Sequence, residues 1–138
     1  MTESLARGLQ AYVQRMQKRE SFYAEITTLN LKGWTPAPRE NSTLCCVNNN
    51  AYLVGGQNHE CNNEVARLMT TSYRPYWENI DYSSIDGIIG RNRHSCVVIG
   101  NKIVIFGGCF MYSMQREARE STNQVLVYDT MYNTYNPV

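Results

Sequence analysis

The sequence predicts an all-β fold of two consecutive four-stranded sheets, the second of them incomplete, behind one amphipathic N-terminal α-helix. Three observations support this prediction. Apolar residues recur at helical spacing between residues 5 and 19. From residue 22 onward, short β-branched and aromatic runs alternate with Gly, Asn and Pro clusters. Part of this second region recurs 52 residues further along the chain.

Residues 1–21 form the predicted helix. Five apolar residues in it are spaced three or four positions apart, so they share one helical face: Leu5, Leu9, Tyr12, Val13 and Met16. A helix this short is marginal in water on its own, so we expect the face to pack on the chain's own sheets or to dock into a neighbouring protein. The five residues are therefore candidate partner contacts, and the segment is too short for a sustained coiled coil.

The remaining residues carry eight candidate strands, each bounded by turn-forming residues. Asn48–Asn50 and Gly100–Asn101 are suited to tight turns because Asn and Gly tolerate positive φ. The candidate strands are Tyr23–Thr28, Ser42–Val47, Ala51–Val54, Val65–Thr70, Tyr76–Asp81, His94–Ile99, Lys102–Phe106 and Gln124–Asp129. We expect Ser42–Val47 to pair antiparallel with Ala51–Val54, and His94–Ile99 to pair with Lys102–Phe106.

An internal repeat is the most informative feature of the sequence. A shift of 52 residues aligns Arg39–Gly56 with Arg91–Gly108 without a gap. An arginine, a turn asparagine and a double glycine are identical in the two copies, and the residues between them keep their chemical type. A period of about 50 residues in an all-β chain indicates a repeated four-stranded sheet.

These features resemble the kelch repeat, which forms one blade of a β-propeller. The residues that carry the resemblance are Arg39, Gly55, Gly56 and Trp77 in the first copy, and Arg91, His94, Gly107, Gly108, Tyr128, Asp129 and Tyr135 in the second. Tyr135 stands where the family usually has Trp, and Thr70-Thr71 replace the Tyr-Asp pair in the first copy. The resemblance implies that the glycines leave the strand through positive φ and that the outer aromatic fills the gap between blades.

The resemblance also sets domain boundaries. Residues 22–38 would supply an outer strand and the loop that leads into the first blade, residues 39–81 the first repeat, and residues 82–138 the second, truncated at its last strand. Propellers have four to eight blades, so two blades would leave apolar faces and strand edges uncovered. The resemblance therefore implies that further blades, from the same gene product or from another protein subunit, complete the structure.

Bulk properties exclude several classes of partner. The 13 basic and 12 acidic residues give a formal net charge of +1, so neither nucleic acid nor an anionic membrane is an expected partner. No apolar run approaches the roughly 18 residues that span a bilayer, and no secretory leader is visible. An odd number of cysteines, five, predicts free thiols in a reducing compartment.

Sites with specific chemistry are weakly supported. His59-x-Cys61 and His94-x-Cys96 do not have the spacing of structural zinc sites, and His94 fits the kelch stretch that follows Arg91. A cysteine nucleophile would need an orienting third group that the sequence does not indicate. No nucleotide-binding motif is present, so we expect no cofactor, no metal and no catalytic residue in this segment.

The sequence predicts a non-catalytic protein-interaction scaffold, in the cytoplasm or on cytoskeletal or ciliary assemblies. The segment after the second double glycine is apolar, and two interpretations of it remain open: a partner-binding loop, or a lid folded onto its own blade. Its candidate partner contacts are Phe110, Met111, Tyr112 and Met114. The alternative function is part of a propeller enzyme, an oxidase or lyase, whose catalytic residues lie outside this segment.

Overall fold

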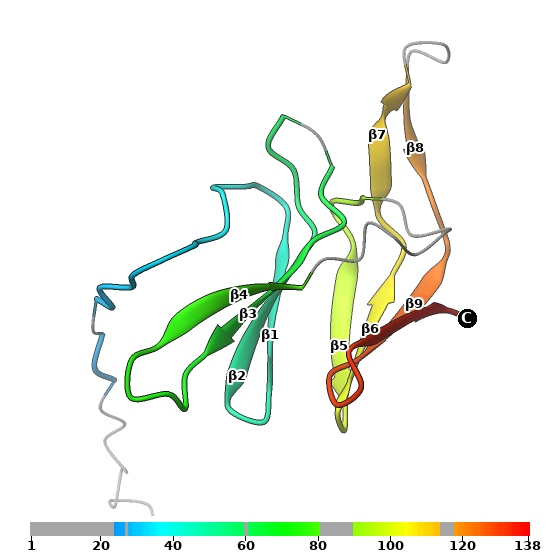
Figure 1. Cartoon of the computed structure of the whole chain (residues 1–138). Coiled ribbons are helices and arrows are strands. Elements are labelled where there is room, and N and C mark those ends of the chain that lie inside the picture. The colour runs from blue at the N-terminus through cyan, green and yellow to red at the C-terminus, as the bar shows by residue number, and fades with distance from the viewer. Residues whose placement is uncertain (1–23, 27, 60, 81–89, 114–117) are drawn as a thin grey trace, which may run out of the picture.

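The structure is a computed structural model that describes residues 24–26, 28–59, 61–80, 90–113 and 118–138 (Figure 1). The predicted N-terminal helix and its five candidate contacts lie outside the described residues, and so does Met114. Among the described residues, no helix has the length and apolar character needed to cross a membrane.

The first sheet consists of four antiparallel strands that neighbour one another in chain order. They are β1 (Thr43–Val47), β2 (Asn50–Val54), β3 (Val65–Met69) and β4 (Tyr76–Ile80). Thr43 pairs with Val54 and Val47 pairs with Asn50, so the predicted first hairpin is confirmed. Its turn contains two asparagines with positive φ, 48° and 64°, which Asn tolerates better than most residues.

The second sheet repeats this arrangement. Its strands are β5 (Ser95–Ile99), β6 (Lys102–Phe106), β9 (Val125–Asp129) and β10 (Thr134–Pro137), in the spatial order β5-β6-β9-β10. Ser95 pairs with Phe106 and Ile99 pairs with Lys102, so the second predicted hairpin is confirmed in the same register as the first.

The expected truncation of the second sheet is wrong. β10 pairs Tyr135 with Tyr128 and supplies a fourth strand. A compact turn makes this possible, because the Asp129 carboxylate accepts hydrogen bonds from the backbone N–H groups of Met131 and Tyr132 at 3.0 and 3.3 Å. The Tyr128 hydroxyl also donates to the Asn133 side-chain oxygen at 2.9 Å. The chain therefore reverses early enough for the last residues to pair with β9.

A further hairpin occupies the segment that we interpreted as a loop after the second double glycine. β7 (Cys109–Ser113) and β8 (Ala118–Ser121) pair antiparallel with a bulge and project beyond the second sheet (Figure 1). The connection between the second and third strands spans residues 55–64 in the first sheet and residues 107–124 in the second. The longer connection has room to form a two-stranded sheet of its own.

The predicted outer strand Tyr23–Thr28 is not formed at the residues that the structure describes. Residues 24–26 and 28–38 carry no strand, and the Ile26 side chain is 97% exposed. Four strands within residues 43–80 already make up the first sheet, and this segment makes no ladder hydrogen bonds to them. The strand predicted at Tyr23–Thr28 therefore finds no partner in the described sheet, and its residues Tyr23 and Thr27 lie outside the described ranges.

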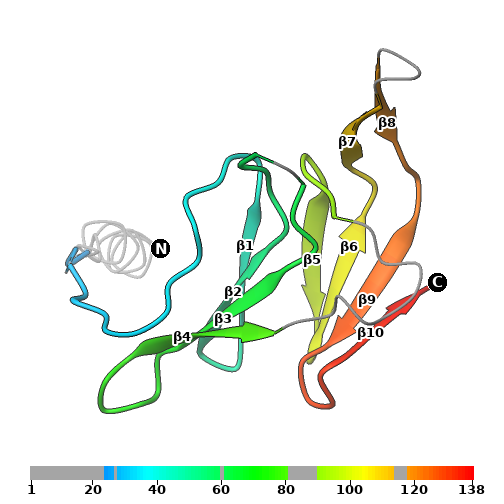
Figure 2. The same cartoon turned by 45° about the horizontal axis from the view of Figure 1, so that its top comes forward.

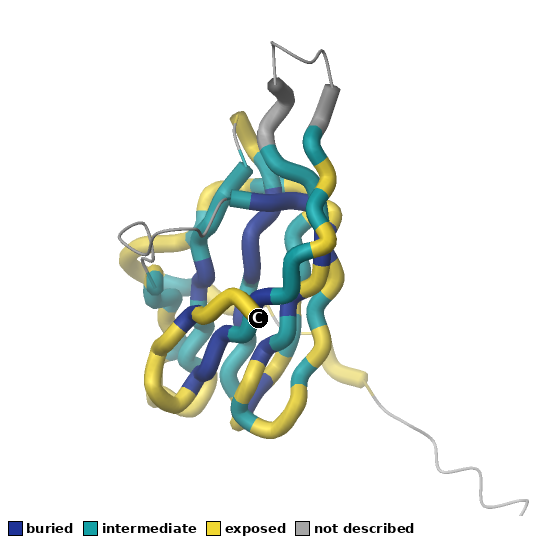
Figure 3. Tube along the Cα trace, turned by 90° about the vertical axis from the view of Figure 1, so that its right-hand side faces the viewer, coloured by how far each residue is buried: buried dark blue, intermediate teal, exposed yellow. Residues whose placement is uncertain are grey.

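The two sheets pack against each other as neighbouring layers. Their first strands, β1 and β5, are in contact, and the sheets spread apart from there (Figures 1 and 2). The buried core between them contains Val47, Tyr52, Val54 and Val65 from the first sheet, and Ile103, Ile105, Leu126, Tyr128 and Tyr135 from the second. Figure 3 shows buried positions within the strands and exposed ones at the turns and the C-terminus.

Three tyrosines link the sheets across this core. The Tyr128 ring lies 5.9 Å from the Tyr52 ring and 6.2 Å from the Tyr135 ring, measured between centroids. Both pairs are inclined, at 63° and 58°, which is a favourable aromatic geometry. Tyr135 thus fills the space between the two sheets, as the resemblance implies for the outer aromatic of a blade.

Candidate protein-interaction site

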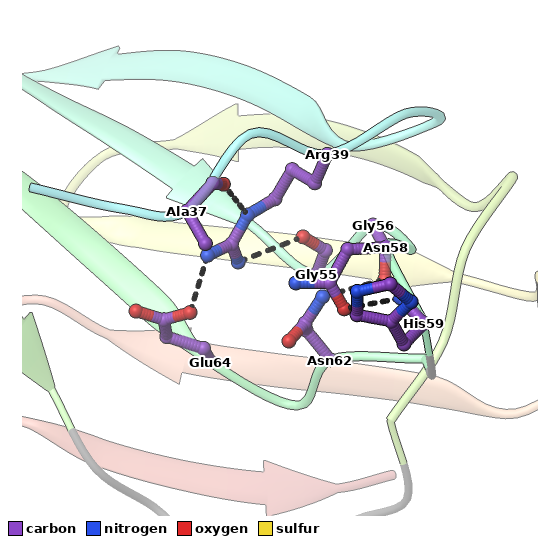
Figure 4. A network of polar contacts seen from close by, with 8 residues as sticks. All are labelled: Ala37, Arg39, Gly55, Gly56, Asn58, His59, Asn62 and Glu64. Atoms are coloured by element: carbon purple, nitrogen blue, oxygen red, sulfur yellow. Dashed lines mark hydrogen bonds and ion pairs between the residues drawn. The ribbon is translucent and has the colours of Figure 1, made fainter.

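Each sheet has a buried arginine that binds the end of its second strand. In the first sheet, the Arg39 guanidinium donates to the Gly55 carbonyl at 3.3 Å and to the Glu64 carboxylate at 2.5 Å (Figure 4). Its Nε also donates to the Ala37 carbonyl at 3.0 Å. These bonds join the lead-in loop, the glycine turn and the start of β3, so the arginine positions three segments at once.

Arg91 repeats the arrangement in the second sheet with one chemical difference. It donates to the Gly107 carbonyl at 3.2 Å and to the Gln124 side-chain oxygen at 2.7 Å. Gln124 precedes β9 as Glu64 precedes β3, so a neutral amide replaces the carboxylate. Arg91 is only 2% exposed, and this burial lowers its pKa. The Phe110 ring lies 5.6 Å from its guanidinium carbon, in cation–π geometry.

His94 forms a side-chain hydrogen bond between the second sheet and the first. Its Nε2 atom lies 2.9 Å from the Thr43 hydroxyl oxygen, which also lies 2.8 Å from the Cys96 sulfur. Burial, followed by the nearby Arg91 charge, lowers the His94 pKa to about 4. The imidazole is therefore neutral near pH 7, and Cys96, whose pKa burial raises, keeps its proton. This geometry suits a structural contact better than catalysis.

Buried Asn92 forms a second link between the sheets. Its backbone pairs with Cys109, and its amide nitrogen donates to the Gln57 side-chain oxygen. The same nitrogen lies 3.3 Å from the Cys61 sulfur. Asn92 is fully buried, yet it stood between two arginines in a stretch that gave no sign of burial. The sequence did not predict the burial of Asn92, because the loop that covers this residue belongs to the other sheet.

All four repeat glycines have positive φ: 56° and 97° at Gly55 and Gly56, and 67° and 101° at Gly107 and Gly108. This agrees with the prediction from the sequence. A Cβ on Gly55 would lie 2.6 Å from the Arg91 carbonyl oxygen and 2.8 Å from the His94 ring. The glycine is therefore required both by backbone conformation and by the close approach of the second sheet.

The other predicted residues lie as follows. Trp77 lies in β4 and is half-buried, and Asp129 ends β9, where the Lys102 ammonium donates to it at 2.9 Å and lowers its pKa. Phe110 is half-buried and packs on Arg91, which favours packing within the chain at this position. Met111 and Tyr112 lie in β7, where the structure describes only their backbone.

The two candidate zinc pairs do not form a metal site in the part of the chain that the structure describes. His94 and Cys96 both contact the Thr43 hydroxyl, whereas Cys61 lies beside Asn92. Over the described ranges, no group of three His, Cys, Asp or Glu side chains could hold a metal ion.

The second sheet has one apolar face that no described residue covers. Strand pairing places six apolar residues on it, alternating with the core residues: Val97, Ile99, Val104, Phe106, Val125 and Val127. The polar residues Ser95, Lys102, Asp129, Thr134 and Asn136 lie at the margins of the same face. Val97, Ile99 and Phe106 are 55%, 62% and 53% exposed, and the other three are half-buried. We call these six residues the open face of the second sheet.

Comparison with known proteins agrees with this architecture. A family model described as the KLHDC2/KLHL20/DRC7 Kelch-repeats domain matches residues 13–138. Since the match covers most of the chain, the protein belongs to the kelch-repeat family. Its two four-stranded sheets are two neighbouring blades of a β-propeller.

Two similar proteins are much longer than this chain. The tRNA wybutosine-synthesizing protein 2/3/4 of Oryza sativa subsp. japonica is 33% identical over 85 residues, which are 60% of this chain and 8% of that protein. The solved structure of YjhT superimposes with a TM-score of 0.58 at 18% identity, over 75% of this chain and 28% of that one. The likeness to YjhT shows the fold alone.

Proposed function

We propose that the chain is a non-catalytic kelch scaffold, a segment of a larger protein or assembly. It binds protein through the open face of its second sheet. The open face of the second sheet is the observation that carries this proposal. Its six side chains are apolar and three of them are more than half exposed. Contiguous apolar patches of this kind on folded proteins are typical of interaction sites.

The buried polar groups support a structural function. Arg39, Arg91 and His94 direct their side chains at backbone and side-chain groups that join strands and sheets. Burial raises the pKa of Cys45 to about 12, with smaller contributions from Cys96 and Cys46, so this thiol is a poor nucleophile at neutral pH. The chemistry-bearing side chains therefore hold the scaffold together.

A photo-crosslinking experiment tests the proposal. A benzophenone amino acid replaces Val97 on the open face, and in a control it replaces Tyr132, a 72% exposed residue in the β9–β10 turn. In cells, we expect crosslinks to protein from position 97 and few from position 132. Equal, weak crosslinking from both positions would contradict the scaffold function.

The expected partners are remaining blades of the same propeller or other protein subunits. We propose a cytoplasmic location, with cytoskeletal or ciliary assemblies as candidates, because the five cysteines are thiols and not disulfides, and four of them are half-buried. Fractionation of cells that express the tagged protein, followed by microscopy, tests the location. Enrichment in a secretory compartment would contradict it.

A second candidate function follows from the rice relative. Its 33% identity over 85 residues favours a segment of a protein that takes part in tRNA wybutosine synthesis, with the catalytic residues outside this segment. Loss of the protein should then remove wybutosine from cellular tRNA, measured by nucleoside mass spectrometry. Unchanged wybutosine in cells without the protein would exclude this candidate and leave the scaffold proposal standing.

A further inference from the structure

A pocket at the outer rim of the first sheet is formed by two segments that lie far apart in the sequence. It has a volume of about 500 Å³ and lies between the irregular segment that leads into β1 and the β3–β4 loop (Figure 1). We call it the rim pocket, and its lining consists of Asn30, Lys32, Tyr73, Arg74, Pro75 and Tyr76. A ligand in this pocket would therefore contact both segments at once.

The rim pocket is separate from the surfaces through which blades stack. The two sheets meet through their first strands, β1 and β5, whereas the pocket lies at the start of β4, the outermost strand of its sheet (Figures 1 and 2). Tyr76 lies on the same side of β4 as Ile80, which packs on the core between the two sheets. Blades of a propeller are arranged radially around a central channel, so their outer rim is not covered by further blades.

The charge of the rim pocket is positive. Lys32 and Arg74 line it, and none of the lining residues is a carboxylate. Glu78, the carboxylate of β4, is bound to Arg67 at 2.6 Å. Within the described ranges, neither Lys32 nor Arg74 has an ion-pair partner, and both are exposed. Two cations from different segments thus line one cavity without a counter-charge, which suits an anionic ligand.

The rest of the lining suits a peptide. Tyr73 is 97% exposed and Tyr76 is 44% exposed, with the half-buried Pro75 close to both in the chain. Tyrosine and arginine are enriched in protein interfaces, and a proline lowers the entropy that a loop loses on binding. The Asn30 amide can both donate to and accept from a peptide backbone. A small inorganic anion would leave this aromatic and amide surface unused.

We propose that the rim pocket binds an acidic segment of a partner protein, an extended peptide that carries two carboxylates beside an apolar side chain. The carboxylates pair with Lys32 and Arg74, and the apolar side chain packs against Tyr73 and Tyr76. Nucleic acid fits less well, because the formal net charge is only +1 and two cations are few for a polyphosphate. The inference goes beyond the scaffold function proposed above, because it assigns a second protein-binding surface of different chemistry.

A selection of random peptides on the intact chain tests the proposal without knowledge of the partner. Octapeptides displayed on phage are selected on the wild-type chain and, in parallel, on the Lys32→Glu/Arg74→Glu variant. The wild type should enrich peptides in which Asp or Glu residues stand next to an apolar residue, and the variant should not. No enrichment of acidic peptides on the wild type, or the same enrichment on both proteins, would overturn the proposal.

Fluorescence anisotropy with the most enriched peptide then locates the site. Arg74→Glu should weaken binding by about tenfold or more, because it replaces an attractive charge pair with a repulsive one. Arg93→Glu is the matched control, since it changes the net charge equally at an exposed arginine outside the rim pocket. It should leave the affinity within about twofold, because salt screens distant charges. Equal losses in the two variants would show a general effect of charge and exclude the rim pocket as the site.

Two further measurements decide which class of ligand the pocket takes. Hydrogen exchange with the peptide bound should show added protection in residues 28–33 and 71–76 and none in β9, because the pocket lies between the first two segments. Inorganic phosphate and a thymidine oligonucleotide should displace the peptide only weakly. Displacement as effective as that by unlabelled peptide would make the pocket a general anion site and overturn the proposal. Crosslinking from position 97 does not depend on these results, so the scaffold function is tested separately.

Discussion

Some glycines near the contact between the two sheets are required for two reasons: their backbone has positive φ, and a neighbouring segment leaves no room for a side chain. Gly108 has a φ of 101°, and a Cβ there would lie 2.7 Å from the Asn92 carbonyl oxygen and 3.0 Å from the His94 Cβ. Gly100 also has positive φ, 59°, but nothing lies within 4 Å of its Cβ position. The two glycines therefore separate the cost of backbone conformation from the cost of close packing.

Gly108→Ala should lower the free energy of unfolding by at least about 2 kcal/mol, because strain in φ adds to a clash with backbone. Gly100→Ala should cost about 1 kcal/mol, since only φ is affected. Urea denaturation followed by circular dichroism measures both. Equal costs for the two variants would show that packing at Gly108 is not a constraint.

The His94 pKa predicts how stability depends on pH. In the unfolded chain the imidazole titrates near 6.5, whereas in the folded chain its pKa is about 4. Below pH 6.5 the unfolded state therefore binds more protons, and stability falls as pH decreases toward 4. Between pH 7.5 and 5.5 this group alone should remove about 1.4 kcal/mol, before most carboxylates titrate.

His94→Gln should abolish most of that pH dependence, because the amide can still hydrogen-bond to Thr43 and does not titrate. The measurement is the urea midpoint of both proteins at the two pH values. His59→Gln, a change at an exposed histidine, is the matched control and should behave as wild type. An undiminished pH dependence in His94→Gln would assign it to another group.

At the scale of elements, Arg39 and Arg91 occupy the same place in the two sheets, so their partners show whether this arginine requires a charged acceptor. Arg39 has a carboxylate partner in Glu64, whereas Arg91 has the neutral Gln124 in the same place. The side chains of Arg39 and Glu64 are 3% and 17% exposed, so the ion pair is largely sheltered from water. The second sheet nevertheless forms with the amide, which indicates that a hydrogen-bond acceptor matters more than its charge.

Glu64→Gln should therefore cost only about 1 kcal/mol and keep the fold, while Glu64→Ala should cost about 2–3 kcal/mol because it leaves the Arg39 guanidinium without this acceptor. Thermal and urea unfolding at low and high salt measure both changes. Glu78→Ala, at the more exposed Arg67–Glu78 pair, serves as a control with a smaller expected effect. A Gln variant as unstable as the Ala variant would show that charge is essential.

The inner hairpins of both sheets could be predicted from the sequence because they depend on local signals. Apolar strands, Asn or Gly turns and double glycines lie within 18 residues of one another in each copy, and the copies support each other. The short β10 strand could not be predicted in this way. Its pairing depends on how the Asp129 side chain tightens the preceding turn, which composition does not reveal.

The candidate site was only partly predictable for the same reason. Glycines and arginines were recognised as repeat residues, and each arginine bonds within its own sheet, but the close approach that requires a glycine at Gly55 comes from the other sheet. Thr43, Gln57 and Asn92 meet partners more than 30 residues away in sequence. Their burial is a property of the packed pair of sheets, and no local pattern distinguishes them from solvent-facing polar residues.

At the scale of the whole molecule, the two sheets share one core. Residues of both sheets are fully buried only because the other sheet is present, and the Tyr52, Tyr128 and Tyr135 rings connect them. The Asn48 side chain also donates to the Asn101 side chain at 3.0 Å, so the turns of the two inner hairpins are joined. The sheets should therefore unfold as one cooperative unit.

Tyr52→Ala tests this cooperativity. Tyr52 is 2% exposed in the first sheet, and its removal leaves a cavity beside Tyr128 in the second, so the expected cost is about 3 kcal/mol or more. Hydrogen exchange followed by mass spectrometry, at fixed protein concentration, should show β9 amides of the second sheet losing protection by the same factor as β2 amides of the first. Tyr73→Ala, at a 97% exposed residue, should leave both unchanged. Loss of protection confined to the first sheet would show that each sheet is stable by itself, and the shared core would then not be what holds the two blades together.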